Sequence, residues 1–415
     1  MFLKRLLLRN FRNYKQAVAV FSPSINLIQG ENGQGKTNLL EAIHLISTGR
    51  SFRTNSLSDL ISFGEKFFYL EADFCKEGVF QSLKIYYDEK TRRVQYNTTV
   101  YSSLNSLLGI LPFVLLTPDD LSLVSGPPIE RRRFLDLHIA QMHPLYVHHL
   151  SRYFKAMKQR NHLLKSKSES AIQSWEQMMA QSASYLVQKR KQVISLLKAP
   201  SSQWMKDLSQ QQDSIEIDYQ PSIPLTFNLE TVVQGDKVMQ DFELESLPIG
   251  VDHSQKVKAT PIGSDYDSKD RVNLSPSTAV ARFNGQDLIL HFQQIWKKMR
   301  PKEMHIGSTL VGPHRDDLSI HLAKKSAKTF SSEGQKRSCI YSLRFAEWEQ
   351  MVKTLGYPPM LGIDDFAIQL DKQRRLQLKN HLKQFNQVFL TSPVALQLDQ
   401  NSHQIFTIEK GTILV

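Results

Sequence analysis

One segment near the start of the chain constrains its fold more than any other. Residues 30–37 read Gly-Glu-Asn-Gly-Gln-Gly-Lys-Thr, between an apolar run at 25–28 and a helix-like run at 39–43. Glycines at this spacing let the backbone curl around a phosphate group and point its N–H groups at the oxygens. The pattern predicts a strand, a phosphate-binding loop and a helix, and therefore a site for a nucleoside triphosphate.

The side chains at the end of this loop suit ATP and Mg²⁺. Lys36 is expected to reach the β- and γ-phosphates, and Thr37 to offer its hydroxyl to Mg²⁺. The helix that begins there would direct the positive end of its dipole at the anion. The other loop residues expected to contact ATP are Gly30, Glu31, Asn32, Gly33, Gln34 and Gly35.

A phosphate loop of this kind needs a carboxylate for the metal, and one candidate lies far downstream. Residues 360–363, Met-Leu-Gly-Ile, form a short buried-strand pattern that ends in Asp364 and Asp365. We expect Asp364 to hold Mg²⁺ through water and Asp365 to orient or deprotonate the attacking water. Taken alone, the string also fits a strand that runs into a solvated turn.

The loop at residues 331–337, Ser-Ser-Glu-Gly-Gln-Lys-Arg, strengthens this interpretation because a helical pattern follows it at 339–348. Ser332, Gly334 and Gln335 would give an anion a hydroxyl, a flexible backbone and free N–H groups. The loop looks like the signature loop of ABC-type ATPases. That resemblance implies that it contacts the γ-phosphate held by the other subunit of a dimer.

The spacing of these motifs indicates a large insertion. Lys36 and Ser332 are 296 residues apart (332 − 36), more than a compact nucleotide-binding domain would leave. Residues 145–198 contain helical patches that are short and broken, without the sustained heptads of a coiled coil. We therefore expect a short helical lobe and not a long arm.

Several further strings resemble the RecF family of bacterial recombination mediators, over nearly the whole chain. They lie at residues 8–14, 117–121, 131–136, 158–164, 312–318 and 363–367. The resemblance implies an α/β, ABC-type, SMC-like P-loop ATPase head with an inserted, mainly helical lobe. It also implies that Arg12 lies beside the nucleotide and that Asp371 makes a contact across the dimer. The family usually has Ser-Glu where this chain has Ile368-Gln369, which puts the tightness of dimer coupling in question.

The same resemblance implies a function in recombinational DNA repair, replication and the response to DNA damage, including the SOS response. The chain would be a weak DNA-dependent ATPase and an ATP-driven homodimer that binds single-stranded, gapped or duplex DNA. It would work with RecR and RecO and help to load RecA. The alternative is an SMC-like structural head that tethers DNA, which the missing heptads disfavour.

The charge of the chain agrees with a polyanionic partner. Lys and Arg number 52 against 40 Asp and Glu, and the net charge is +12. The residues proposed to contact DNA are Arg152, Lys155, Lys158 and Arg160, although such a stripe is also typical of a solvated helix face. Arg131 to Arg133 are as well suited to buried structural pairs, and Asp316 and Asp317 to bracing the strand that follows them.

Cysteine content and motif positions set the expected location and domain organisation. Two cysteines, Cys75 and Cys339, fit a reducing cytoplasm, and the apolar run at 6–8 is too short to span a membrane.

We expect an ATPase head made of residues 1–140 and 302–415, with a helical lobe at 141–301. A polar insertion at about 232–277 carries 8 acids and 5 bases and has no role that we can assign.

Overall fold

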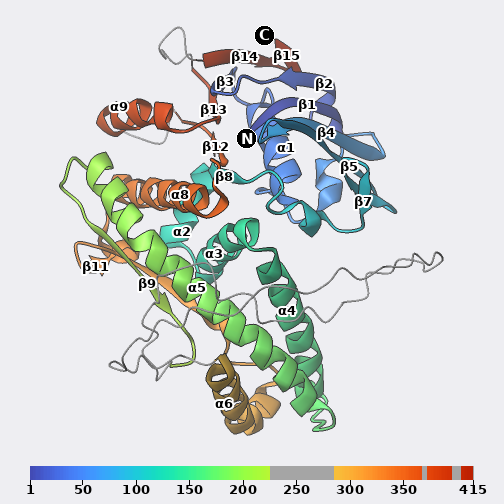
Figure 1. Ribbon diagram of the computed structural model, residues 1–415, viewed down its shortest axis with the longest axis vertical. Helices are drawn as coiled ribbons and strands as arrows, with labels where there is room; N and C mark the ends of the chain where they lie inside the picture. Colours follow the sequence, from blue (N-terminus) through green and yellow to red (C-terminus); the bar gives the residue numbers. More distant parts are fainter. Residues whose placement is uncertain (225–284, 367–371, 395–402, 415) are drawn as a thin grey trace, which may run out of the picture. The chain divides into compact units, whose positions relative to one another are not determined.

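The computed structural model describes residues 1–224, 285–366, 372–394 and 403–414, without the side chains of residues 372–374 (Figure 1). The polar insertion at about 232–277 lies outside the described residues. So do Ile368, Gln369 and Asp371, which means that the expected dimer contact of Asp371 stays a prediction.

A six-stranded, mainly parallel sheet carries the nucleotide motifs. Its strand order is β15-β14-β3-β13-β12-β8, and only β15 runs antiparallel to its neighbour. Because the carboxyl ends of parallel strands meet at one edge, the residues that follow β3, β12 and β13 are brought together there. The strands are β3 (Ile25–Gln29), β8 (Phe113–Leu116), β12 (Met360–Ile363), β13 (Val388–Ser392), β14 (His403–Glu409) and β15 (Thr412–Leu414).

A second, antiparallel sheet comes from the first hundred residues. Its order is β2-β1-β4-β5-β6-β7, and its residues alternate between buried and more exposed positions, as expected for a sheet with one covered face. The strands are β1 (Phe2–Phe11), β2 (Tyr14–Val20), β4 (Phe67–Lys76), β5 (Val79–Asp88), β6 (Arg92–Tyr96) and β7 (Thr99–Tyr101).

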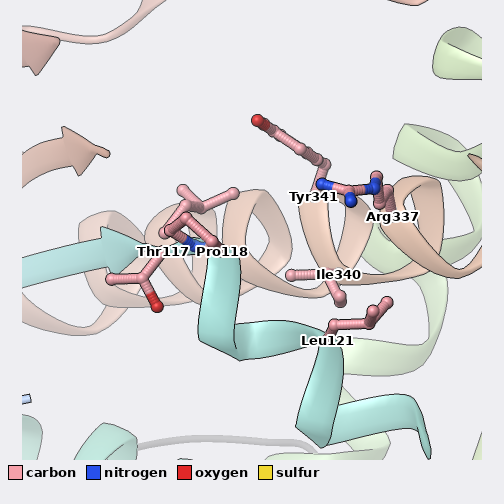
Figure 2. Close-up of a pocket in the computed structure, with 7 residues that line it drawn as sticks. Thr117, Pro118, Leu121, Arg337, Ile340 and Tyr341 are labelled. Carbon is pink, nitrogen blue, oxygen red and sulfur yellow. The ribbon is translucent and has the colours of Figure 1, made fainter. Parts of the chain in front are cut away.

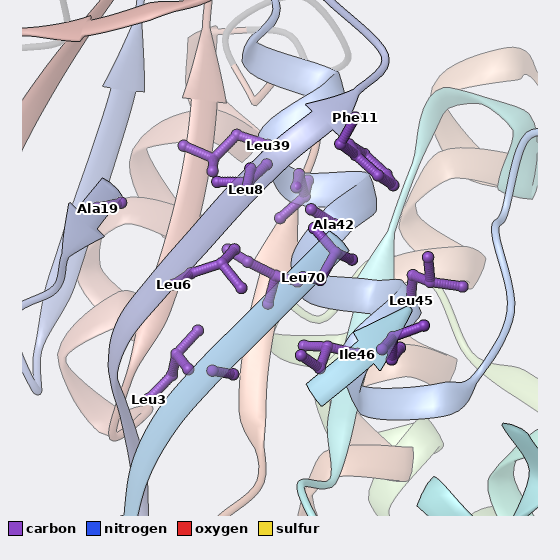
Figure 3. Close-up of a cluster of buried hydrophobic side chains, with 14 of the residues drawn as sticks. Leu3, Leu6, Leu8, Phe11, Ala19, Leu39, Ala42, Leu45, Ile46 and Leu70 are labelled. Atoms are coloured by element: carbon purple, nitrogen blue, oxygen red, sulfur yellow. The ribbon is translucent and has the colours of Figure 1, made fainter. Parts of the chain in front are cut away.

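Helix α1 (Lys36–Thr48) supplies the centre of the hydrophobic core (Figure 3). Leu6 and Leu8 of β1 and Leu70 of β4 face Leu39 and Ala42 of this helix. The core also takes in Phe389 of β13 and Phe406 of β14, so α1 is covered by both sheets. This explains why α1 is buried around most of its circumference and not along one stripe.

The remaining described elements form a helical lobe and a small antiparallel sheet of order β11-β10-β9. The small strands are β9 (Ile215–Gln220), β10 (Asp317–Leu322) and β11 (Lys325–Ser326). The helices are α2 (Leu121–Ser125), α3 (Pro128–Met142), α4 (Pro144–Lys165), α5 (Ile172–Leu208), α6 (Gly285–Ile306), α7 (Ala327–Phe330), α8 (Glu333–Leu355) and α9 (Lys372–His381). Short 3-10 turns occur at Leu57–Leu60, Leu104–Leu107, Pro118–Asp120, Pro313–Arg315 and Leu382–Gln384.

Helix α5 corrects the expectation of short, broken helical patches. It runs without interruption for 37 residues and packs against α4, α6 and α8. Its buried positions recur every three or four residues, but Glu176 and Arg190 occupy two of them. Those two buried charges break the apolar pattern in the sequence while leaving the helix intact. Helix α4 has 22 residues and is about 33 Å long, so α4 and α5 can pack together only over that length. The described residues contain no long coiled coil.

Arg160 is also different from what the sequence suggested. Its side chain is fully buried and donates to Glu176 at 2.9 Å, to Glu303 at 2.6 Å and to the Thr309 hydroxyl at 2.9 Å. A buried charge with two carboxylate partners holds α4, α5 and α6 together. Removing it would leave Glu303 without a cation, while Glu176 would keep its pair with Arg300 at 2.6 Å. We therefore withdraw the expected DNA contact at Arg160.

The loop before β10 is braced as expected. Arg131 of α3 donates from Nε to Asp317 Oδ1 at 2.7 Å and from Nη2 to Oδ2 at 2.9 Å. Asp316 is buried and accepts hydrogen bonds from the backbone N–H of Ser222 at 2.8 Å and from the hydroxyl of Tyr219. These pairs fix the strand that leads back towards the signature helix. No described helix combines the length and apolar character needed to cross a membrane.

Candidate nucleotide site

The predicted phosphate loop lies between β3 and α1, as the sequence indicates. Gly30 and Gly35 have φ angles of 147° and 124°, in a region that side chains rarely adopt. A Cβ atom at Gly35 would lie 2.7 Å from the side-chain nitrogen of Asn13, and one at Gly30 would meet the backbone of Ile408. The two glycines therefore serve both the curl of the loop and the close approach of its neighbours.

Lys36 lies across the inside of the loop. Its Nζ atom donates to the carbonyl oxygens of Gly30 at 2.7 Å and Glu31 at 2.8 Å. Burial lowers the pKa of Lys36, while the charges of Asp365 and Asp364 act in the opposite direction. A phosphate in the loop would offer this ammonium group stronger partners than two neutral carbonyls.

The metal-binding side chains predicted from opposite ends of the chain meet. The Thr37 hydroxyl donates to the carboxylate of Asp364, at 3.1 Å from Oδ1 and 3.2 Å from Oδ2. Asp364 is only 4% exposed, and burial raises its pKa in spite of its hydrogen bonds to hydroxyl groups. A hydroxyl and a carboxylate so placed fit Mg²⁺, which takes a few protein oxygens and completes its shell with phosphates and water.

Thr391, at the end of β13, belongs to this site although sequence reasoning did not find it. Its hydroxyl donates to Asp364 Oδ1 at 2.6 Å and accepts from the backbone N–H of Asp365 at 2.8 Å. Asp365 has a φ angle of 53°, so the chain turns sharply directly after the buried carboxylate. The sequence does place a polar residue directly after the apolar run Val388–Leu390. That signal for a site residue is weak without knowledge of the strand order.

The turn between β1 and β2 lies against the phosphate loop. Asn13 donates from Nδ2 to the carbonyl of Gln34 at 2.7 Å, and the Tyr14 hydroxyl donates to the carbonyl of Gly35 at 2.9 Å. Arg12 makes a bidentate pair with Glu41 of α1, at 2.8 and 2.9 Å. Arg12 is thus held by the helix that follows the loop, and its contact with a nucleotide stays a prediction.

Glu41 is a second residue that the sequence did not reveal. Its carboxylate is buried and accepts from Arg12, from the Ser51 hydroxyl at 2.5 Å and from Arg53 at 3.5 Å. Arg53 also donates to Asn38 at 2.7 Å. This network ties the start of α1 to the segment after it and orients the first turn of the helix.

The predicted signature loop begins helix α8. Ser332 is exposed and caps the helix, since its hydroxyl accepts from the backbone N–H of Gln335 at 3.2 Å. The Gln335 side chain reaches back to the N–H of Ser332 at 3.0 Å and donates to Asp213 at 3.0 Å. The loop is therefore ordered, and its exposed serine is accessible to a second molecule.

A small cavity lies between the edge of the parallel sheet and the signature helix (Figure 2). Thr117, Pro118 and Leu121 line one side, and Arg337, Ile340 and Tyr341 of α8 line the other. Its volume is about 10 Å³, room for roughly one water molecule. Leu116 also lines this cavity, and its carbonyl accepts a hydrogen bond from the backbone N–H of Asp364 at 2.9 Å.

The stripe proposed for DNA is only partly exposed. Lys155 and Lys158 are exposed on α4, whereas Arg152 is partly buried and donates to Gln181 at 3.0 Å. Among the described residues, no group of three or more His, Cys, Asp or Glu side chains is placed to hold a metal ion.

Comparison with known proteins places this arrangement in a class. The RecF/RecN/SMC N terminal domain family matches residues 2–412. A solved structure of the SMC head bound to the C-winged helix domain of ScpA superposes with a TM-score of 0.51 at 15% identity, covering 100% of this chain and 97% of the other, which shows the fold alone. The fold and the site define an ABC-type, SMC-like P-loop ATPase head.

Within that class the chain belongs to the RecF family. It is 39% identical to the DNA replication and repair protein RecF of Protochlamydia amoebophila, over 98% of this chain and 99% of the relative. It is 32% identical to the protein of the same name from Chlamydia caviae, over 99% and 97% of the two chains. A solved structure of the recombination mediator protein RecF-ATPrS in the RecFOR pathway matches with a TM-score of 0.79 at 25% identity, over 99% of this chain and 97% of that one.

Proposed function

We propose that the protein is an ATP-dependent DNA-binding protein of recombinational repair and replication, and that weak ATP hydrolysis switches its conformation. The observation that carries this proposal is the approach of the Thr37 hydroxyl to the Asp364 carboxylate at 3.1 Å, beside Lys36 in a fully formed phosphate loop. Mg²⁺ bound here with ATP would neutralise charge on the β- and γ-phosphates. Thr37 and Asp364 would hold the metal, directly or through water.

Lys36 gives the most direct test of this nucleotide site. Lys36→Ala removes the cation of the loop, so we expect ATP binding to weaken and ATP-dependent dimerisation to be lost. Lys206→Ala, on the exposed surface of α5, is the matched control. Sedimentation with and without ATP would measure both variants, and persistent dimerisation of Lys36→Ala on ATP would show that the assigned site is wrong.

Asp365 is proposed to orient or deprotonate the water that attacks the γ-phosphate. It directly follows Asp364, and its backbone N–H is fixed by Thr391 at 2.8 Å. Asp365→Asn keeps the size of the side chain but removes the base, so ATP should bind and remain unhydrolysed. Unchanged phosphate release by this variant would remove Asp365 from the catalytic role.

ATP is proposed to lie between two copies of the chain. Ser332 supports this because it is exposed at the start of the 23-residue helix α8, whose first turn it caps. This arrangement is suited to receiving the γ-phosphate of the ATP bound by a partner. The family resemblance implies that Gly334 and Asp371 would contribute contacts to the same dimer interface. This homodimer would bring two DNA-binding surfaces around one DNA molecule and make the second engagement intramolecular.

The proposed DNA ligand is supported by the net charge of +12 and by the names of the relatives, which are DNA replication and repair proteins. Lys155 and Lys158 are the exposed members of the proposed stripe. If they contact phosphates, replacing both with Ala should weaken duplex binding and lower the salt slope by about one unit per residue. A double variant with the affinity and slope of the wild type would show the stripe to be a solvated face.

Partners and organisation complete the proposal. One solved relative is named as a mediator of the RecFOR pathway, so we propose RecR and RecO as partners and RecA loading on gapped DNA as the outcome, in the cytoplasm. The division into a head, residues 1–140 and 302–415, and a lobe, residues 141–301, is proposed on the positions of the motifs. Loading assays on gapped DNA would separate this function from SMC-like tethering, which would hold DNA without loading RecA.

A further inference from the structure

The outer face of the antiparallel sheet has an ordered pattern that the nucleotide site does not use. Strand register places Arg9, Tyr69, Tyr86 and Arg93 side by side across β1, β4, β5 and β6. The neighbouring positions in these strands, such as Leu8 and Leu70, are buried in the core. Because strand residues alternate between faces, the row of arginines and tyrosines lies on the face away from the core.

Two exposed cations on this face lie over aromatic rings. The guanidinium of Arg9 is 5.5 Å from the ring centre of Phe67, which itself stacks on Tyr86 at 5.6 Å with an angle of 26° between the rings. At the other end of β1, the ammonium of Lys4 is 4.7 Å from the ring centre of Phe80. Lys4 and Arg9 are five residues apart in one strand, so the two cations are separated by roughly 16 Å along the sheet.

The Lys4 and Phe80 pair borders a groove of 590 Å³, which is also lined by Arg5, Gln81 and Asn97. Phe80 is 63% exposed, so part of its ring stays accessible to a ligand beside the Lys4 ammonium. The groove thus combines an aromatic surface, the cation of Lys4, the ion pair of Arg5 with Asp73, and amide groups that can both donate and accept hydrogen bonds.

Charge is distributed unevenly over this face. In the middle, Arg5 pairs with Asp73 at 3.1 Å and Lys84 pairs with Glu71 at 3.6 Å, so those cations are neutralised. Lys4, Arg9 and Arg93 have no carboxylate partner within the part of the chain that the structure describes. Unpaired cations next to aromatic rings suit phosphates and bases, and the central carboxylates can accept from the amino groups of bases.

We propose that this outer face binds single-stranded DNA, with Phe80 at one end and Phe67 and Tyr86 at the other as stacking surfaces and with Lys4, Arg9 and Arg93 contacting phosphates. A single strand fits better than a duplex, because unpaired bases can offer their faces to aromatic rings while duplex bases are covered by their neighbours. This site deepens the proposed DNA-binding function and rests on it. It is separate from the α4 stripe, which is assigned to duplex phosphates.

The test compares two variants on two DNA probes with the full-length protein. Fluorescence anisotropy would follow the binding of labelled single-stranded oligo(dT) and of a labelled duplex across a range of salt concentrations. Phe80→Ala should weaken single-strand binding about 10-fold through lost stacking. Arg9→Gln should lower the salt slope on single strands by about one unit.

Controls separate loss of the site from loss of the fold. Val79→Ala removes a 58% exposed apolar side chain from the same hairpin and should bind both probes as the wild type does. Phe80→Trp keeps a stacking ring and should retain single-strand affinity. Neither Phe80→Ala nor Arg9→Gln should change duplex binding.

The outcomes distinguish this inference from the function on which it rests. Single-strand binding unchanged in both variants would overturn the site, as would a wild type that binds duplex but not single strands, and in both cases the proposed DNA-binding function would stand. A wild type that binds neither probe, with or without ATP, would overturn the DNA-binding function itself.

Discussion

Thr391→Val tests the predicted metal site at a residue that only the structure reveals. Valine has nearly the same shape but lacks the hydroxyl, so the variant loses the 2.6 Å hydrogen bond to Asp364 and leaves the N–H of Asp365 without its 2.8 Å partner. A hydrogen bond to a charged group contributes about 1.5–3 kcal/mol, and a buried unsatisfied donor costs about 1–3 kcal/mol. Since Thr391 and Asp364 are both buried, we expect the free energy of unfolding to fall by about 3 kcal/mol.

Urea unfolding followed by circular dichroism would measure this loss in the nucleotide-free protein. Thr391→Ser keeps the hydroxyl and removes only a methyl group, so it should lose about 1 kcal/mol. In the Asp364→Asn background the effect of Thr391→Val should shrink, because the charged acceptor is gone, and a double-mutant cycle would give the coupling energy. A Thr391→Val protein as stable as the wild type would refute the proposed role of this hydroxyl.

Three further predictions address the loop, the lobe and the effect of pH. Gly35→Ala should weaken ATP binding at least about tenfold, measured with a fluorescent nucleotide, because the φ of 124° is strained and the new Cβ would meet Asn13 at 2.7 Å; equal affinity would contradict the loop geometry. Arg160→Met should lower the free energy of unfolding, measured in urea, by about 3–5 kcal/mol. Lys158→Met, on the exposed side of α4, is the control and should change stability little. Small losses of similar size in both variants would refute the buried role of Arg160. Burial lowers the pKa of His44 from 6.5 to about 4. As the pH falls, this histidine therefore binds a proton in the unfolded chain before it does so in the folded protein. The free energy of unfolding should drop by up to about 3 kcal/mol between pH 6.5 and 4. His44→Gln should flatten that pH dependence, and an unchanged profile would exclude this histidine as a source.

The sequence predicted the parts of the site that are local. Residues 30–37 and the strand at 360–363 with its following acids can each be recognised from consecutive positions in the sequence. The structure brings Thr37 and Asp364 together across 327 residues. The start of helix α8 can likewise be predicted from Ser332 and Gln335, which form a cap within one turn. Such features depend on short-range spacing, which a sequence displays directly.

The residues that the sequence did not reveal depend on long-range pairing. Thr391 acts only because β13 lies beside β12 in the sheet. The burial of Arg160 cannot be predicted from the sequence, because an arginine at helical spacing looks the same on a solvated face as in a buried ion pair. The length of helix α5 is hidden in the sequence for the same reason, since Glu176 and Arg190 occupy core positions that are normally apolar.

Mixing two defective variants gives the most direct test of the central claim, that Lys36 of one chain and Ser332 of a second chain act on the same ATP. Lys36→Ala keeps an intact signature loop, and Ser332→Arg keeps an intact phosphate loop, so each alone should fail to dimerise and to hydrolyse ATP. A mixture can form one complete site from the phosphate loop of one chain and the signature loop of the other. We predict that equal amounts of the two variants recover ATP-dependent association in sedimentation experiments, together with part of the wild-type phosphate release. A mixture as inactive as its separate components would contradict the shared site.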